Sequence, residues 1–372
     1  MIILTNALHD ADTNICKAAI DSLGQLSKID PEIVTILISV LRDSDSFVRQ
    51  YMVRNLGLLG KVSPEIISVL IDALNNVDAL VRREATRSLG QLNQVTPDVI
   101  GALLLVLCDS NVLVRSVAVE SLGKLGQATP KVIDALLSAL HESNLLMRCE
   151  AARSLGQLGQ TSHEVITALL GALCDVHFSV RSEATKSLGR LGQTSPEVVT
   201  ALLNFLNNAD SNISHWVAHS LGLIGQPSSE VVTALLKELD QSNDWSLRHN
   251  AAISLGKVSQ GDEPTIQALW YGLLDKDKDV RTACAEGLAQ LGQRFPEVSE
   301  EIAKRLVQAI GNPEFDKLDN SKIRAYNYAF DALWLLMHAK THNRVHEGFK
   351  TEAQQVFVPE LSVDEQGIVG LG

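Results

Sequence analysis

The chain lacks the features that mark several protein classes. Only 5 of its 372 residues are cysteines and none of them forms a Cys-x-x-Cys pair, which indicates reduced thiols and no disulfide framework. It has no run of about eighteen uncharged apolar residues, and no charged start followed by a cleavable apolar stretch. We therefore expect a cytoplasmic protein that makes no membrane contact.

Catalytic motifs are also missing. The sequence contains no GxxxxGKS/T, GxSxG or HExxH motif, and no GxGxxG after a strand. Gly60-Lys61 comes nearest to a phosphate loop, but it lacks the upstream glycine and is explained as the end of a helix. These absences predict a protein that is not an enzyme and that carries no cofactor.

What the chain does have is a repeat. The dipeptide Leu-Gly recurs every 33 residues, with one interval of 34 and a degenerate last copy at Leu288. The leucines of the full copies are Leu23, Leu56, Leu89, Leu122, Leu155, Leu188, Leu221 and Leu255. Such a period is typical of a solenoid, in which each unit buries its apolar face only against its neighbours.

Each repeat has the pattern of a helical hairpin. The apolar residues of a first helix follow one helical stripe, as at Ile33, Ile36, Leu37, Val40 and Leu41. A second helix has an equivalent buried face with small residues that allow close helix contact, as at Val81, Ala85, Ser88, Leu89 and Leu92.

Turn residues mark the helix ends. Prolines lie in the first turn of the first helices, mostly after an Asp, Ser or Thr N-cap, at Pro31, Pro64, Pro97, Pro130, Pro196 and Pro296. Glycines follow the second helices, where a left-handed residue ends a helix, at Gly60, Gly126, Gly159, Gly192, Gly225 and Gly292.

These patterns predict an all-α fold, a right-handed α-α superhelix of about ten helical hairpins. Nine repeats span residues 1–293, a capping helical pair spans 294–340, and an extended or partly disordered tail spans 341–372. Met1 aligns with Val34 of the next repeat, so the first helix lacks its cap and opening proline. Either the chain is a fragment, or another domain or subunit stacks on this uncapped end.

One repeat carries a family resemblance. The segment Asp175-Val-His-Phe-Ser-Val180-Arg181-Ser-Glu-Ala-Thr-Lys-Ser-Leu188-Gly189 resembles the HEAT-like repeats of the phycobilisome-lyase type, as does the whole region 1–293. In that family an acidic loop residue faces an arginine six residues later, and these pairs form a ladder. The resemblance implies such pairs at Asp43/Arg49, Asp109/Arg115, Glu142/Arg148, Asp175/Arg181 and Asp275/Arg281. It implies weak junctions where the pattern fails, at Asp10/Cys16, Asn76/Arg82 and Asn208/Ser214.

The resemblance also suggests functions. Such repeats occur in bilin lyases and in the C-terminal sensing solenoids of NACHT-type signalling NTPases, and the segment 324–337 is similar to the closing segment of the second group. This implies a recognition or scaffold solenoid of a larger signalling protein, which binds a protein partner or further domains of its own chain. Because fold alone does not assign chemistry, a bilin lyase that holds a chromophore against Trp216 and His219 remains an alternative, as does a structural spacer.

The second helices expose one flank, on which we expect the residues equivalent to Glu84, Arg87 and Gln91 to lie together, facing the concave groove of a HEAT-like fold. In a chain of net charge −12, this flank carries a basic stripe, formed by Arg54, Arg87, Lys124, Arg153, Lys186 and Arg190. The stripe would suit an anionic partner, or it is neutralised locally by glutamates three residues before Arg87, Arg153 and Lys186. The acidic composition argues against nucleic acid.

The same flank has one apolar patch. Trp216, His219, Leu223 and Ile253 replace the charged or polar residues of other repeats, and Trp245 lies in the loop with the inserted residue. Exposed aromatic residues with apolar neighbours are typical anchors of a binding site. The patch either binds a partner or packs against the tail or a neighbouring domain.

Histidines and the remaining aromatics suggest no further site. His215 and His219 are one helical turn apart and His249 repeats the position of His215, but no carboxylate or cysteine completes a metal site. We expect solvated histidines and no metal. Trp270, Tyr271 and Trp334 fall within helix stripes and are expected in the core.

Overall fold

The computed structural model describes residues 4, 7, 10, 12–26, 46–58, 63–92, 95–192, 194–207, 213–310, 361–363 and 369–371. The chain divides into two compact units, which we call unit 1 (Met1–Leu191) and unit 2 (Gly192–Gly372). Each unit is described by itself.

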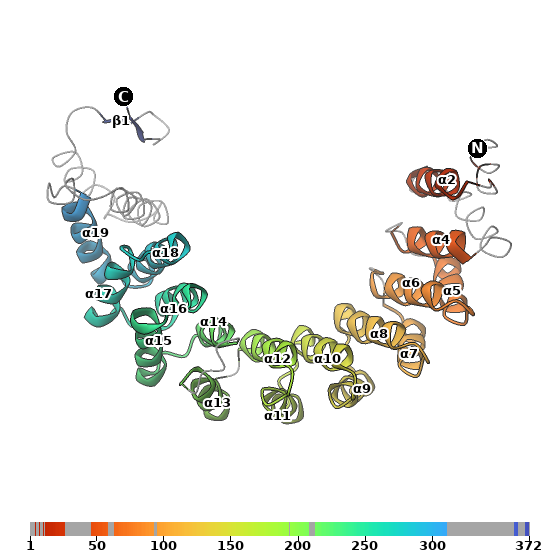
Figure 1. Cartoon of the computed structure of the whole chain (residues 1–372), viewed down its shortest axis with the longest axis horizontal. Helices are drawn as coiled ribbons and strands as arrows, with labels where there is room; N and C mark the ends of the chain where they lie inside the picture. The colour runs from red at the N-terminus through yellow and green to blue at the C-terminus, as the bar shows by residue number, and fades with distance from the viewer. Residues whose placement is uncertain are drawn as a thin grey trace. The chain divides into compact units, whose positions relative to one another are not determined.

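Unit 1 consists of helical hairpins whose helices form two rows (Figure 1). The second helices of the hairpins form one row: α4 (Ser46–Leu58), α6 (Ala79–Gly90), α8 (Val112–Leu125), α10 (Leu145–Leu158) and α12 (Phe178–Leu191). The first helices form the other row: α5 (Pro64–Ala73), α7 (Pro97–Val106), α9 (Pro130–Leu140) and α11 (His163–Ala172). Helix α2 (Thr13–Leu26) packs against α4 and extends the row of second helices.

Unit 2 repeats this arrangement. Its second helices are α14 (Ser214–Ile224), α16 (Trp245–Val258) and α18 (Lys278–Arg294). Its first helices are α13 (Pro196–Asn207), α15 (Ser229–Gln241), α17 (Glu263–Gly272) and α19 (Pro296–Ile310). In the tail, strands β1 (Leu361–Val363) and β2 (Val369–Leu371) pair antiparallel, with Leu361 opposite Leu371.

Helix ends follow the predicted turn chemistry. The side chains of Ser63, Thr96 and Thr129 each accept a hydrogen bond from a backbone N–H three residues on, at 3.3–3.4 Å. The predicted left-handed glycines are confirmed at positions with φ between 61° and 70°: Gly126, Gly159, Gly192 and Gly225. Gly292 was expected to end a helix but lies inside α18, which continues to Arg294 and stops before Phe295-Pro296.

The Leu-Gly motif is explained by the contact between neighbouring second helices. Ser154 Oγ donates a hydrogen bond to Val119 O in the preceding second helix at 3.0 Å, and a Cβ added to Gly123 would lie 2.5 Å from Ser154 Cβ. We call this contact the serine–glycine clasp. The same hydroxyl-to-carbonyl bond recurs in both units, at Ser88, Ser121, Ser187 and Ser254. The leucine beside each glycine is buried in the core, so the motif both fills the interior and lets the helices approach.

The predicted fold class, an all-α solenoid of helical hairpins, is confirmed. The first helix of the predicted capping pair has the expected bounds, Pro296–Ile310, whereas its second helix and Trp334 lie outside the described residues. The repeat, cap and tail boundaries stay predictions.

Candidate functional site

The exposed flank of the second helices has four rows of side chains. Residues 80, 84, 87 and 91 of α6 and its continuation follow the spacing i, i+4, i+7 and i+11, which places them on one face of the helix. We name the rows after these residues, as the Leu80, Glu84, Arg87 and Gln91 rows, and the whole surface the second-helix face. Equivalent residues occur every 33 positions, or 34 across the insertion.

The Glu84 row is less exposed than predicted. Glu84 is only 4 % exposed, Val117 is also buried, and Trp216 is half-buried. The serine–glycine clasp brings neighbouring second helices so close that each helix covers this row of the next one. The Arg87 row is mostly half-exposed, and the Gln91 row is the outermost in unit 1.

The basic stripe is paired with glutamates in unit 1. Arg87 lies 2.8 Å from Glu84, and Arg153 bridges Glu150 and Glu183 of the next repeat at 2.8 and 3.0 Å. Lys186 contacts Glu183 at 3.0 Å, and Lys124 contacts Glu120 at 2.6 Å. Arg190 and Arg54 are exposed at the ends of their helices. The stripe is therefore locally neutralised, as the i, i+3 spacing predicts.

In the basic stripe, the arginine side chains are more exposed than the glutamates that they contact. The side chain of Arg87 is 39 % exposed, whereas that of its partner Glu84 is 6 % exposed. Arg153 and the two glutamates that it joins show the same order. Burial raises the pKa of Glu150 despite its contact with Arg153. The outer surface of the stripe is consequently positive, with its carboxylates underneath.

The apolar patch on α14 and α16 brings together residues from two neighbouring second helices of unit 2. We call it the α14–α16 patch, formed by Trp216, His219, Leu223 and Ile253. The Trp216 ring lies 4.9 Å from the His215 ring and 6.4 Å, edge to face, from the His219 ring. Leu223, in the Gln91 row, is 42 % exposed, and Ile253 is half-buried.

Trp245 is exposed at the first residue of α16. It precedes the Leu80-row residue Ser246 by one position, so it points about 100° around the helix from the patch rows. Its position extends the apolar surface of unit 2 beyond the second-helix face.

The ladder joins neighbouring repeats. Arg82 donates through Nε and Nη2 to both carboxylate oxygens of Asp109, at 2.7 and 2.9 Å. Arg148 binds Asp175 in the same bidentate way, and in unit 2 Arg248 binds Asp275. Each carboxylate follows its arginine by 27 residues, in the loop of the next repeat.

This geometry corrects the pairing that the resemblance implied. The arginine six residues after each acid binds the main-chain carbonyl of that acid, as Arg115 Nη1 does with Asp109 O at 2.8 Å. Arg181 and Arg281 bind the carbonyls of Asp175 and Asp275 likewise. Because a guanidinium has five donors, Arg82 and its equivalents reach the loop carbonyl and the next carboxylate at once. The junction at Arg82 is therefore not weak, and Asn208 lies outside the described residues.

Arg49 departs from the implied ladder as well. It is half-buried on α4, and Asp43, its expected partner, lies outside the described residues. The position 27 residues after Arg49 is Asn76, so the bidentate pair of the other repeats has no carboxylate there. The charge of Arg49 acts instead on Asp78: a hydrogen bond from Ser46 holds the pKa of Asp78 below its ordinary value, and Arg49 lowers it further. The repeats thus differ in this pair: Arg82 is followed by the carboxylate of Asp109, and Arg49 by the amide of Asn76.

The ladder carboxylates hold shifted pKa values. The hydrogen bond from Arg82 holds the pKa of Asp109 below its ordinary value. Burial raises the pKa of Asp175 and Asp275, but the hydrogen bonds from their arginines and from the backbone outweigh it and lower both. These carboxylates are therefore ionised structural groups, unlike catalytic acids, whose pKa values are raised toward neutrality.

Comparison with known proteins assigns the family. The model of HEAT repeats matches residues 3–90, 34–122, 67–145, 100–189, 133–222 and 232–320. The chain belongs to the HEAT repeat family. Among curated proteins, none matches it.

Two solved importin-type structures have the same fold. An importin β crystal structure is 15 % identical over 96 % of this chain and 55 % of its own, with a TM-score of 0.66. A Kap95–Nup1 complex is 16 % identical over 94 % of this chain and 51 % of that chain, with a TM-score of 0.63. The CpcE–CpcF phycocyanin lyase complex from Nostoc is 21 % identical over 73 % of this chain and 95 % of that chain, with a TM-score of 0.41. The chain spans about half the length of the two importin-type structures, and these identities show the fold alone.

Sequence reasoning missed an apolar row of the HEAT repeats. Phe47, Leu80, Leu113 and Leu146 are equivalent residues in four second helices of unit 1, and they are 38, 45, 46 and 37 % exposed. The signal was present in the sequence, since all four are large apolar residues at the repeat spacing of 33. In unit 2 the Leu80 row carries Ser246 and Asp279 instead.

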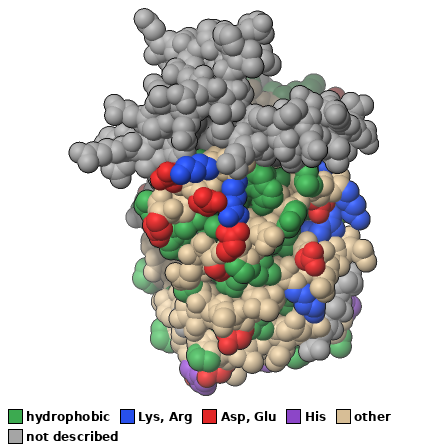
Figure 2. All heavy atoms as spheres, turned by 90° about the vertical axis from the view of Figure 1, so that its left-hand side faces the viewer, with side chains coloured by type: hydrophobic (Ala, Val, Ile, Leu, Met, Phe, Trp, Pro, Cys, Tyr) green, Lys and Arg blue, Asp and Glu red, His purple; other side chains and the backbone are tan. Residues whose placement is uncertain are grey.

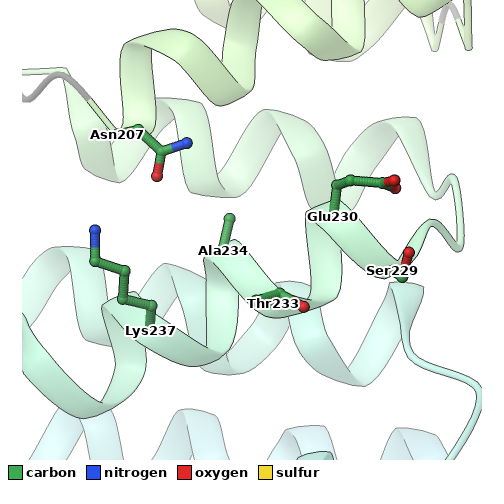
Figure 3. Close-up of a pocket in the computed structure, with 6 residues that line it drawn as sticks. All are labelled: Asn207, Ser229, Glu230, Thr233, Ala234 and Lys237. Carbon is green, nitrogen blue, oxygen red and sulfur yellow. The ribbon is translucent and has the colours of Figure 1, made fainter.

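Described residues line a hollow in each unit. A small pocket of about 220 Å³ on the second-helix face of unit 1 is lined by Arg54, Leu58, Glu84, Arg87, Ser88 and Gln91. A shallow hollow of about 310 Å³ lies between the first helices α13 and α15, as Figure 3 shows, with Asn207 facing Ala234 and Lys237. Neither brings together the groups of a catalytic centre.

Ion pairs also occur on the surface of unit 2. From the side of α17 and α19, Figure 2 shows acidic and basic side chains intermingled, consistent with Arg305 between Glu263 and Glu301, each at 2.8 Å. Within the described residues, no three His, Cys, Asp or Glu side chains form a group that could hold a metal ion. Nor is any described helix long and apolar enough to cross a membrane. Tyr271, expected in the core, is exposed on α17.

Proposed function

We propose that this HEAT-repeat chain is a non-catalytic scaffold that binds a protein partner through the α14–α16 patch. The proposal rests on a change in the kind of side chain along the second-helix face. The Arg87 and Gln91 rows hold paired charges and amides over most of unit 1, but they hold His219 and Leu223 on α14 and Ile253 on α16.

Exposure of this patch has a thermodynamic cost that a partner would remove. Burial of apolar surface stabilises a complex by roughly 25 cal/mol per Å², and contiguous exposed apolar residues mark interaction surfaces more than isolated ones do. Leu223 projects from the outer row, with Ile253 beside it on α16. Trp216 lies deeper, against His215 and His219, and provides a rigid aromatic floor for the patch.

The family supports a macromolecular partner. HEAT solenoids expose long helical faces, and one chain similar to this one, Kap95, is known in complex with Nup1. For this chain the finer hypothesis is that it forms the recognition part of a larger, cytoplasmic, NACHT-type signalling protein. It rests on the resemblance of residues 324–337, which lie outside the described residues.

The test is quantitative capture with the double variant Leu223→Ser/Ile253→Ser. The full chain is used as bait in host extract, with cross-linking and mass spectrometry to map the contacted residues. Tyr271→Ser is the control, because it removes a large exposed side chain from the first helix α17, away from the patch. We expect about tenfold less captured partner with the double variant, the equivalent of about 1.4 kcal/mol, and no change with the control.

Other outcomes separate the alternatives. Equal capture by wild type and the double variant would contradict the proposal and favour a structural spacer. The visible absorption spectrum of the purified wild-type chain tests the bilin lyase alternative, since a bound tetrapyrrole absorbs visible light.

A further inference from the structure

We infer that the second-helix face of unit 1 is a separate docking surface for an acidic amphipathic α-helix of a protein partner. The inference rests on the proposed function in one respect, that the partner is a protein. It uses a different unit and different residues from the α14–α16 patch, so the two can fail independently.

The first half of the surface is apolar. The Leu80 row of unit 1 places Phe47, Leu80, Leu113 and Leu146 at the beginning of four successive second helices. Each is more than a third exposed, although residues of this kind are normally buried. Scattered exposed leucines need no explanation, but four at equivalent positions form a line along the unit.

The second half is basic. Seven to eleven residues further along each helix, the Arg87 and Gln91 rows present Arg54, Arg87, Lys124, Arg153 and Arg190 toward solvent. Their glutamate partners Glu84 and Glu150 are largely covered. An approaching ligand therefore meets cations first, in a chain whose net charge is −12.

The spacing of these rows matches a helix laid across the second helices. Seven residues along an α-helix span about 10.5 Å, close to the diameter of about 10 Å of a helix with its side chains. A helix placed between the rows would turn its apolar side to the Leu80 row and its acidic side to the arginines. Packed helices lie about 8–10 Å apart, so each repeat would meet about one heptad of the ligand.

A pocket gives this surface an anchor point. The hollow of about 220 Å³ at the Leu58 end of α4 has an aliphatic wall at Leu58 and guanidinium groups at Arg54 and Arg87. That combination accommodates an aliphatic side chain with a carboxylate next to it. Glu84 lies at the same pocket and already holds Arg87 at 2.8 Å, which fixes the direction of that guanidinium.

The surface chemistry favours an acidic helix over a nucleic acid. A polyphosphate chain would use the arginines but leave the four apolar side chains of the Leu80 row exposed. An acidic amphipathic helix uses both halves of the face. Basic helices are disfavoured by the outward cations.

The experiment measures binding of synthetic helices to the full chain by fluorescence anisotropy. The probe is a peptide of about 22 residues with leucines on one face and glutamates elsewhere, long enough to cross about three repeats. Comparison peptides replace every glutamate by lysine, or every leucine by glutamine. A single-stranded oligonucleotide of equal charge represents the nucleic acid outcome.

The decisive protein variant is Leu80→Ser/Leu113→Ser, with Leu105→Ser as its matched control. Leu105 is a strongly exposed leucine of the same unit, but it lies on α7 in the row of first helices. We expect the double variant to bind the acidic probe about tenfold more weakly and the control to bind it unchanged. Lys124→Gln should weaken binding less and reduce its dependence on salt.

Several results would overturn the inference. These are no measurable binding of the acidic probe, stronger binding of the lysine peptide or the oligonucleotide, or equal losses in the double variant and the Leu105→Ser control. Circular dichroism confirms that each variant is folded. If Leu223→Ser/Ile253→Ser loses its captured partner while the unit 1 variants bind the probe like wild type, the proposed function stands and this inference fails.

Discussion

The second-helix faces of the two units differ in where they expose apolar side chains. In unit 1 the Leu80 row is apolar and the Arg87 row is charged, as at Leu113 and Arg153. In unit 2 the described residues of the Leu80 row are polar, Ser246 and Asp279, and the Arg87 row contains Ile253 between His219 and Glu286. The serine–glycine clasp and the bidentate arginine–aspartate pair occur in both units. Stacking thus uses a set of positions common to both units, which leaves the solvent-facing rows free to differ between surfaces.

The largest effect is expected from variants that disrupt the serine–glycine clasp, which both units share. Gly123→Leu in unit 1 and Gly222→Leu in unit 2 insert a side chain where even a Cβ would overlap Ser154 or Ser254. Overpacking of this kind costs about 3 kcal/mol, so we expect similar drops in the thermal unfolding midpoint for both variants. Gly101→Leu is the control, since a Cβ there meets nothing within 4 Å and the position is helical. A drop in only one unit would show that the clasp is not a common element.

A smaller effect tests the corrected ladder. Asp109→Ala leaves Arg82 without its bidentate partner in a largely covered site, and we expect a loss of about 2 kcal/mol in the free energy of unfolding. Glu142→Ala is the comparison, because its contact with Arg115 is longer, at 3.6 Å, and more exposed, so about 0.5 kcal/mol is expected. Urea unfolding of the two variants measures the difference. Equal losses would contradict the assignment of the pairs.

The Arg82–Asp109 pair also predicts that the stability of the protein depends on pH. The pKa of Asp109 is lower in the folded protein than in the unfolded chain, so its stabilisation is complete above the unfolded value of about 3.9. It is lost as the pH falls through the lower folded value. The stability difference between wild type and Asp109→Ala should therefore be constant from pH 5 to 7 and shrink below about pH 4.

The smallest effect is expected from substitutions in the Leu80 row, which test whether this row binds the acidic probe helix in unit 1 but not in unit 2. Ser179 occupies the Leu80 row in α12, where the apolar line of unit 1 ends. Ser179→Leu should lengthen that line by one repeat and tighten binding of the acidic probe helix about twofold to threefold, since one added leucine contact is partly exposed. Ser246→Leu on α16 in unit 2 is the matched substitution and should leave probe affinity unchanged. Anisotropy titrations of both variants decide the point.

Much of the fold followed from the sequence because it depends on local chemistry. The first-helix stripes, the Ser and Thr caps and the left-handed glycines concern residues within one or two turns of each other. The prediction that Gly292 ends a helix was wrong. Helix α18 continues through this glycine to Arg294 and ends before Pro296, because a proline disfavours helical backbone in the residue before it.

The parts that could not be predicted depend on distances between repeats. The burial of Glu84 follows from how closely α4 and α6 approach, which the helical spacing of one repeat does not contain. The partner of Asp109 was ambiguous in the same way, because a loop carboxylate can reach the arginine on either side. Leu80 shows a different failure: large apolar residues recur at its position every 33 residues, but this spacing does not by itself tell whether they are buried or exposed.

The serine–glycine clasp also bears on how such a chain changes length during evolution. Each hydroxyl reaches the carbonyl 35 residues earlier, and across the single insertion Ser254 reaches Ala218, 36 residues earlier, with the same bond of 2.8 Å. The clasp therefore aligns neighbouring second helices with each other and tolerates an inserted residue in the loop between them. Duplication or loss of one whole repeat would join the same two surfaces again, so a gene encoding this solenoid can gain or lose binding surface one repeat at a time without redesign of its interior.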